Sequence, residues 1–272
     1  MDMGVQGFNG GSTIDPAQTV RLAKLAETLG YRSWWTTEHV VLPSPKVPPS
    51  PVEPTTPILD PLVHLGFVAA VTSRLELATG VLILPQRNPV VLAKQVATLD
   101  VLSGGRFTLG VGAGYLEPEL AAVGVPLADR GRRTDEYLDA MTALWSAAPS
   151  FQGRYASFAN VDAHPKPSGV RIVVGGHSAG ALRRAVSRGH GWLGIGSPEE
   201  LAGNLARLAT AADQVERPAH LGKLEINVLP TTSLDVEVLR RYEDLGTDQV
   251  VVNSGQGLDE RSMEHLIGLK PA

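Results

Sequence analysis

Residues 175–180 combine features suited to binding a phosphate group. They read Gly-Gly-His-Ser-Ala-Gly and lie between an apolar run and a helix-like segment. Two glycines let the backbone approach a ligand closely, and the amides at the start of a helix attract an anion. We therefore expect a cofactor phosphate to bind here. The residues expected to bind it are Gly175, Gly176, His177 and Ser178.

A second pair of glycines, Gly194 and Gly196, ends the next apolar run and precedes Ser197, a residue type that often begins helices. Neighbouring strand ends lined by glycine favour one phosphate-bearing cofactor that spans both. Glycines also form tight turns between strands and helices without binding a ligand. Both interpretations stay open at this point.

Residues 176–180 also match the G-x-S-x-G pattern of serine hydrolases. In that interpretation Ser178 is the nucleophile, Asp235 or Asp244 the acid and His265 the base. Such enzymes also need an upstream oxyanion-hole segment of the His-Gly-Gly-Gly kind, and the sequence contains none. A serine hydrolase is therefore the less favoured alternative.

His39 is the side chain best suited to proton transfer, because imidazole titrates near neutral pH. It ends a strand predicted at Ser33–His39, directly after Glu38. Glu38 could orient His39 or face the outer helices, and a single histidine is also compatible with a structural role. We expect both residues to be catalytic.

The glycine-rich segment 110–114 resembles a dinucleotide fingerprint, but the spacing G-x-G-x-x-G is absent. The better interpretation is a strand end against which a flat ring system fits. We expect Gly112 and Gly114 to contact the cofactor there. Tyr115 follows them directly, and we expect it to be a catalytic residue.

Composition excludes several classes of protein. The seven histidines show no H-x-H or H-x-x-x-H pair and there is no cysteine, so no metal site is expected. The formal net charge is −4, and no partner such as nucleic acid or an anionic membrane is indicated. Neither a signal peptide nor an apolar stretch of about 20 residues is recognisable, so we expect a cytoplasmic enzyme.

The elements that must position these residues alternate regularly along the 272-residue chain. Eight short apolar runs each precede a helix-like segment, which is the pattern of a (β/α)8 barrel, or TIM barrel, in the α/β class. Such a barrel places its chemistry at the C-terminal ends of its strands, where the candidate cofactor residues lie. We therefore expect one barrel domain over residues 1–272.

The boundaries of the predicted elements follow from the apolar runs and from the helix-start and helix-stop residues. The predicted strands are Val5–Phe8, Ser33–His39, Leu75–Leu84, Arg106–Gly114, Arg171–Gly176, Gly191–Gly196, Leu224–Leu229 and Gln249–Asn253. The predicted helices are Ala17–Leu29, Pro61–Thr72, Val90–Leu102, Thr134–Trp145, Ala179–Arg188, Pro198–Ala212, Asp235–Leu245 and Glu260–Leu269.

Two insertions interrupt this alternation. The segment 43–61 contains eight prolines, which exclude a helix or a central strand. It leaves the C-terminal end of the second strand, so we interpret it as a partly stiff lid over the site. The aromatic-rich segment Phe151–Val161 predicts a short hairpin before the fifth strand.

Taken in order, several segments resemble the bacterial luciferase-like monooxygenase superfamily, and most closely the branch that uses the deazaflavin coenzyme F-420. The segments that carry the resemblance are Trp35–His39, Ala78–Leu82, Arg87–Pro89, Leu99–Arg106, Gly110–Tyr115, Gly124–Pro126, Arg130–Glu136 and Val174–Ser178. The resemblance implies a barrel that transfers a hydride between this coenzyme and a small organic substrate. It also implies a homodimer.

The resemblance assigns roles to individual positions. A bulge with a cis peptide in the third strand supports the cofactor ring in such proteins, and it maps onto Gly80 and Val81, with Thr79 beside them. The active-site histidine of the family maps onto His39. In one respect the chain departs from the family, because Tyr115 stands where some deazaflavin dehydrogenases carry a glutamate proton donor.

Two further alternatives stay open. An FMN-dependent monooxygenase of the same fold would use O2, since flavin reacts with oxygen and the deazaflavin does not. A non-catalytic barrel that binds a ligand would keep its function when His39 is replaced by alanine. The coenzyme that the protein binds separates the first alternative from the hydride-transfer hypothesis.

Overall fold

Parallel strands form a closed barrel in the computed structural model, which describes residues 1–6, 9–253 and 259–270. The barrel closes where β3 pairs with β5. The strands of this sheet are β1 (Asp2–Gln6), β2 (Ser33–Thr36), β3 (Glu76–Thr79), β4 (Leu82–Ile83), β5 (Phe107–Gly112), β8 (Arg171–Gly175), β9 (Gly191–Ile195), β10 (Glu225–Leu229) and β11 (Gln249–Val252). The predicted barrel is confirmed, although Phe8, the predicted end of the first strand, lies outside the described residues.

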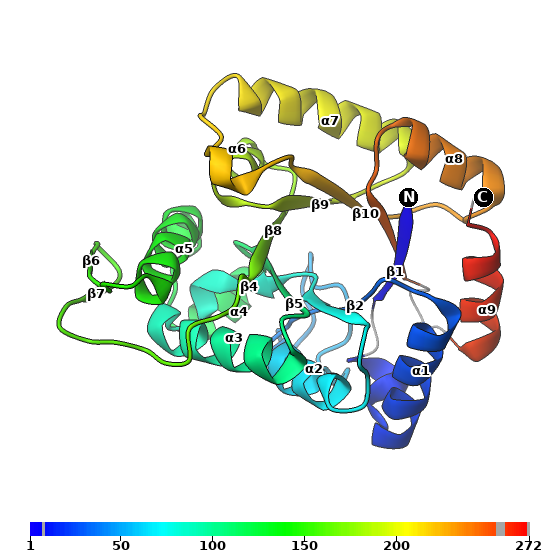
Figure 1. Cartoon of the computed structure of the whole chain (residues 1–272), viewed down its shortest axis with the longest axis horizontal. Helices are drawn as coiled ribbons and strands as arrows, with labels where there is room; N and C mark the ends of the chain where they lie inside the picture. Colours follow the sequence, from blue (N-terminus) through cyan, green and yellow to red (C-terminus); the bar gives the residue numbers. More distant parts are fainter. Residues whose placement is uncertain (7–8, 254–258, 271–272) are drawn as a thin grey trace.

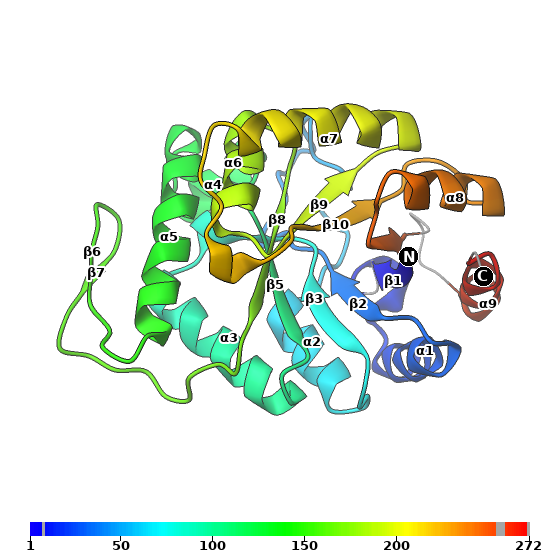
Figure 2. The same cartoon turned by 45° about the horizontal axis from the view of Figure 1, so that its top comes forward.

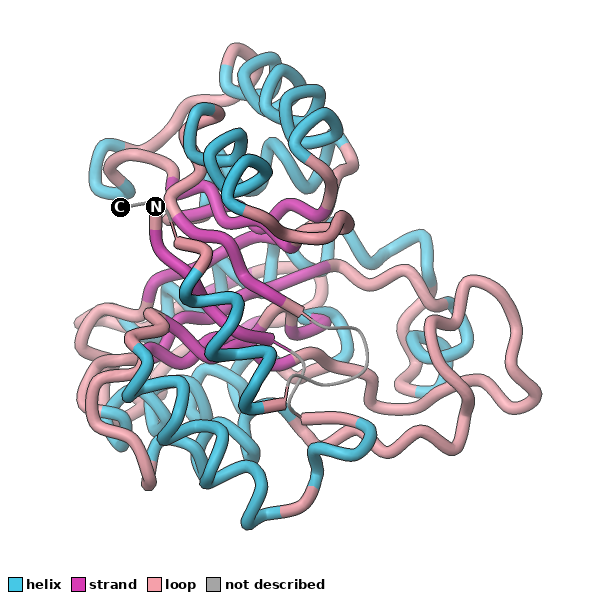
Figure 3. Tube along the Cα trace, turned by 90° about the vertical axis from the view of Figure 1, so that its right-hand side faces the viewer, coloured by secondary structure: helices cyan, strands magenta, loops and turns pink. Residues whose placement is uncertain are grey.

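Helices surround these strands (Figures 1 and 2), and the strands lie between them in Figure 3. The helices that follow barrel strands are α1 (Pro16–Leu29), α2 (Pro61–Ala69), α3 (Pro89–Ser103), α5 (Arg130–Trp145), α6 (Ala179–Arg188), α7 (Pro198–Ala212), α8 (Val236–Asp244) and α9 (Glu260–Gly268). Several of these helices begin after an Asp, Asn or Ser whose side chain accepts a hydrogen bond from a backbone N–H of the first turn. This bond gives a partner to an N–H group that has none within the helix. Within the described residues no helix is long and apolar enough to cross a membrane.

The apolar core has two layers. The larger layer lies between strands and helices and includes Trp34, Trp192 and Tyr242. The smaller layer fills the inside of the barrel and includes Trp35, from the same strand as Trp34, and Leu193. Strands buried on both faces explain why the sequence shows apolar runs rather than alternation.

The third strand is interrupted where the sequence predicts one continuous strand. β3 and β4 both pair with β5, and Gly80 and Val81 lie between them, joined by the cis peptide that the resemblance implies. At the break, the Thr79 hydroxyl donates to Gly110 O at 2.6 Å and accepts from Gly110 N at 2.9 Å. This side chain therefore replaces main-chain hydrogen bonds where the two strands separate.

The two predicted insertions are present, together with one α-helix that the sequence analysis missed. Residues 43–60 of the proline-rich segment contain neither α-helix nor barrel strand, and Pro61 begins α2. Asn9 ties the end of this segment to the barrel by donating to Leu59 O at 2.9 Å. The hairpin is shorter than predicted and consists of β6 (Phe151–Gln152) and β7 (Ser157–Phe158). The additional helix is α4 (Glu117–Ala122), between β5 and α5.

The hydrogen bonds of Thr79 predict a measurable loss of stability. Thr79→Val keeps the shape of the side chain but leaves both the N–H and the C=O of Gly110 without this partner in the core. We expect the free energy of unfolding to fall by about 2–3 kcal/mol in urea denaturation. Thr36→Val is the matched control, because its buried hydroxyl makes a single long contact of 3.5 Å to Ala78 O. Equal losses in the two variants would contradict this account.

Candidate functional site

A hollow of about 370 Å³ opens at the C-terminal ends of the strands, where the sequence analysis places the chemistry. It receives residues from β1, β9 and β10 and from the segments after β2, β3 and β11. Its lining residues are Gln6, Thr37, Gly80, Ile195, Leu229, Pro230 and Asn253. None of these side chains is charged, so the hollow suits a neutral group.

Gly80 lines this hollow, and its neighbours leave no space for a side chain at this position. Gln6 donates its amide to Gly80 O at 2.5 Å. A Cβ on Gly80 would lie 2.8 Å from both the Gln6 amide nitrogen and the Trp35 ring. The interrupted strand therefore rests directly on two side chains from β1 and β2.

Val81 occupies the space that two of the predicted cofactor-binding glycines leave open. A Cβ on Gly112 would lie 2.6 Å from Val81 Cγ2, and one on Gly175 would lie 2.8 Å from Val81 Cγ1. Gly114 has a φ of 79°, and a Cβ there would lie 2.7 Å from Ile83. Gly112 and Gly175 therefore make room for Val81, and Gly114 makes room for Ile83. Their predicted contact with a cofactor stays a prediction.

Glu38 is buried and binds β4, the strand that follows the interruption. Its carboxylate accepts from Ile83 N at 2.5 Å and from Arg87 Nε at 2.9 Å, and Arg87 also pairs with Asp60 at 2.7 Å. Burial raises the pKa of Glu38, and the guanidinium of Arg87 opposes that shift. The sequence left open whether Glu38 orients His39 or faces the outer helices. In the structure Glu38 pairs with Arg87 and not with His39.

His39 instead contacts Glu119 and Tyr115. Its Nδ1 lies 2.9 Å from Glu119 Oε2, and its ring meets the Tyr115 ring edge-on with centroids 6.2 Å apart. Tyr115 is 49% exposed, and burial of the rest of the ring, followed by the charge of Glu119, raises the pKa of its hydroxyl. Tyr115 therefore keeps its proton at neutral pH, and the structure brings two of the predicted catalytic residues together.

Glu119 was missed by the sequence analysis because α4 was not predicted. The signal was present in Glu117-Pro118-Glu119, since proline and acidic residues are typical of the first turn of a helix. Its pairing with a residue 80 positions earlier could not be read from local pattern.

The predicted phosphate segment follows β8. Gly176 has a φ of 110°, and its carbonyl accepts from Trp192 Nε1 at 2.9 Å. His177 Nε2 accepts from Ile195 N at 3.0 Å, which leaves its proton on Nδ1. Burial and then the charge of Arg207 lower the pKa of His177, so it stays neutral with one donor available. This arrangement offers a turn, a donor and a helix start in one place.

Ser178 begins α6, where its hydroxyl accepts from Ala181 N at 3.2 Å. The base required by the hydrolase interpretation, His265, lies on α9, which packs on α1, whereas α6 packs on α5 and α7. Figure 2 shows α6 and α9 on different parts of the barrel. The structure therefore does not assemble a serine hydrolase triad from these residues.

The second glycine pair has local explanations. A Cβ on Gly194 would lie 2.3 Å from the Trp192 ring, so glycine is needed beneath that indole. Gly196 has a φ of 154°, and its carbonyl accepts from Tyr242 Oη at 2.7 Å. Both residues lie at the predicted strand end, and their predicted contact with a cofactor stays a prediction beside these local contacts.

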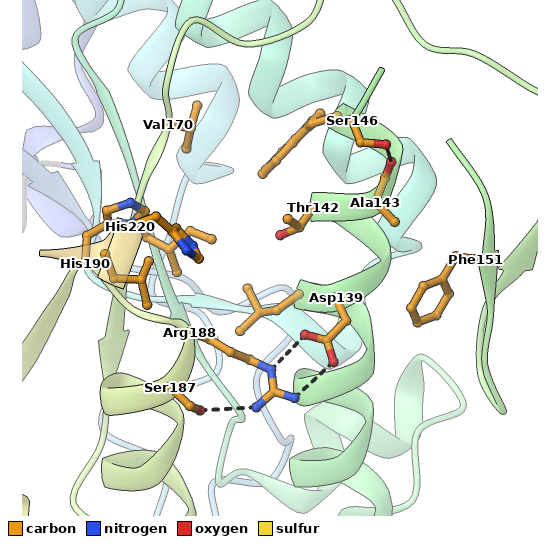
Figure 4. Close-up of a pocket in the computed structure, with 14 residues that line it drawn as sticks. Asp139, Thr142, Ala143, Ser146, Phe151, Val170, Ser187, Arg188, His190 and His220 are labelled. Carbon is orange, nitrogen blue, oxygen red and sulfur yellow. Dashed lines mark hydrogen bonds and ion pairs between the residues drawn. The ribbon is translucent and has the colours of Figure 1, made fainter. Parts of the chain in front are cut away.

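The hollow drawn in Figure 4 is larger, about 660 Å³, but lies at the other end of the barrel. It lies near the start of β8, beside α5 and the end of α6, where Arg188 donates to both carboxylate oxygens of Asp139. None of the predicted site residues lines it. Among the described residues, no three side chains of His, Asp or Glu come together as a metal site.

Comparison with known proteins gives a consistent family. A profile described as luciferase-like monooxygenase matches residues 2–241. An uncharacterized protein of Mycobacterium tuberculosis is 32% identical over 244 residues, which cover 86% of this chain and 83% of that relative.

Solved structures share the fold. An F420-dependent secondary alcohol dehydrogenase in complex with an F420-acetone adduct superposes with a TM-score of 0.82 at 16% identity, covering 98% of this chain and 97% of the other. The oxygenating constituent of 3,6-diketocamphane monooxygenase from Pseudomonas putida, in complex with FMN, gives a TM-score of 0.64 at 18% identity, covering 90% and 71%. At these identities the similarity concerns the fold.

The contact between Val81 and Gly175 predicts a rescue. Gly175→Ala forces a methyl group against Val81, and we expect a loss of about 1–3 kcal/mol in the free energy of unfolding. Val81→Ala removes the colliding methyl group. The loss of stability in the double variant should therefore be smaller than the sum of the losses in the two single variants. Gly180→Ala is the control, because a Cβ there meets no atom within 4 Å. Additive losses in the double variant would rule out the contact.

Proposed function

Because the chain belongs to the luciferase-like monooxygenase family, we propose that it is an oxidoreductase that transfers a hydride between the deazaflavin coenzyme F-420 and a small organic substrate. The observation that carries the proposal is the arrangement of the barrel mouth. The interrupted third strand lies at an uncharged hollow, and a buried carboxylate holds His39 at the end of the neighbouring strand.

The residues present fit such a coenzyme. Gly80, with Val81 beside it, offers a surface without a protruding side chain at the hollow, against which a flat ring can lie. The turn at Gly176 and the start of α6 at Ser178 offer donors to a phosphate, and His177 Nδ1–H adds one more. When bound, the coenzyme supplies a ring carbon that accepts or donates a hydride.

The protein's own residues supply orientation and a proton. Ile195, Leu229 and Pro230 give the hollow an apolar wall, which favours a moderately hydrophobic substrate. His39 would exchange a proton with the substrate oxygen or nitrogen as the hydride is transferred. Tyr115, whose ring touches that of His39, would act as a hydrogen-bond donor at the same place.

The second candidate is an FMN-dependent monooxygenase of the same family. The FMN-bound monooxygenase of P. putida has this fold, and the family description is that of a monooxygenase. The uncharged hollow suits an isoalloxazine ring as well as a deazaflavin ring. The two candidates differ in whether the reduced protein–coenzyme complex consumes O2.

We expect purified protein to quench the fluorescence of coenzyme F-420 saturably at micromolar concentration and to bind FMN much more weakly. Preference for FMN, together with O2 uptake in the presence of reduced FMN, would replace the deazaflavin proposal by the monooxygenase. If the protein binds neither coenzyme, both the deazaflavin-dependent and the FMN-dependent proposals are overturned. Size-exclusion chromatography of the same sample tests the expected homodimer.

His39→Ala should lower kcat by about 10²- to 10⁴-fold in the hydride-transfer assay, because it removes the imidazole proposed to exchange the proton. The affinity for the coenzyme should change little. His164→Ala is the control, since that imidazole is 71% exposed on the loop before β8. Unchanged turnover in His39→Ala would contradict the role proposed for His39, whereas a protein that binds the coenzyme without any turnover would support the non-catalytic barrel.

A further inference from the structure

The end of β2 is held by side chains from other elements of the chain. Asn9 accepts from Thr37 N at 3.1 Å and donates to Thr37 O at 2.8 Å. Glu38 pairs with Arg87. The next two residues are bound by Glu119, so the segment that carries His39 is fixed on both sides of the imidazole.

Glu119 makes one hydrogen bond with each carboxylate oxygen. Oε1 accepts from Val40 N at 2.6 Å, and Oε2 lies 2.9 Å from His39 Nδ1. The residue is 2% exposed, and among the basic side chains that the structure describes only His39 lies within ion-pair distance of it. A carboxylate buried in this way is costly unless both oxygens receive donors.

We propose that Glu119 is a positioning residue that keeps a proton on His39 Nδ1, so that Nε2 is the nitrogen that exchanges a proton in the reaction. The Val40 amide can only donate, which makes Oε1 an acceptor. An ionised carboxylate then offers Oε2 as an acceptor too, and the imidazole must present Nδ1–H to it. The statement about Nε2 rests on the function proposed above, whereas the tautomer follows from the contacts of an ionised Glu119 with a neutral His39.

The geometry also fixes the direction of the ring. The Val40 amide holds the Glu119 carboxylate in place, so the imidazole cannot turn without breaking its own contact with Oε2. The edge of the Tyr115 ring lies against it. This restraint reduces the motion that would otherwise have to be arrested when a substrate binds.

The test is the 15N spectrum of the imidazoles in the protein without coenzyme, with His39→Gln identifying its signals. At a pH where His39 is neutral, we expect Nδ1 to carry the proton and Nε2 to show the shift of an unprotonated ring nitrogen. A proton on Nε2 in the unchanged protein would overturn the proposal without the need for any variant of Glu119.

Glu119→Gln sharpens this test. The glutamine oxygen is expected to keep the hydrogen bond from Val40 N. The NH2 group of the glutamine then faces His39 Nδ1. Nδ1 then becomes the acceptor, so the proton should move to Nε2. Glu117→Gln is the matched control, with the same change of charge on the exposed side of the same helical turn, and should leave the spectrum unchanged. A Glu119→Gln spectrum identical with that of the unchanged protein would contradict the proposal.

Turnover distinguishes this proposal from the function on which it rests. With the coenzyme that binds, Glu119→Gln should lower kcat by roughly two orders of magnitude while Glu117→Gln keeps it, since the wrong tautomer cannot accept the proton. If neither coenzyme binds, the proposed function fails, and the spectrum of the free protein still decides the tautomer. Equal turnover in both variants would overturn the role of Nε2.

Discussion

The barrel mouth depends on the way in which the third strand is interrupted. Between β3 and β4 the chain leaves the ladder for two residues, and each side of the gap is held by a side chain. The Thr79 hydroxyl bonds both main-chain groups of Gly110, and the Glu38 carboxylate takes up the amide of Ile83. Gly80 and Val81 are thereby presented at the mouth of a barrel whose remaining strands are regular.

Two buried carboxylates give this region its order. Glu38 and Glu119 each accept a backbone amide near the mouth, and each has one basic partner. Since burial of an unpaired carboxylate is costly, these contacts select one arrangement of the strand ends. The imidazole of His39 is therefore oriented before any ligand arrives, which is the condition for efficient proton transfer.

The sequence was sufficient for the barrel, because apolar runs report local structure, and the site at the strand ends stays a prediction. It was insufficient for contacts between distant residues. The pairing of Glu38 with Arg87 joins residues 49 positions apart, and that of His39 with Glu119 joins residues 80 apart. The sequence also could not show that Val81 fills the space beside Gly112, because a glycine looks the same whichever neighbour occupies that space.

The most direct measurement is a crystal structure of the protein soaked with the deazaflavin coenzyme. The account predicts the ring against Gly80 and Val81, with the substrate face toward His39 Nε2 and the phosphate at residues 176–178. A coenzyme bound in the hollow near His190 and Arg188, or a ring that leaves the Gly80 surface uncovered, would contradict it.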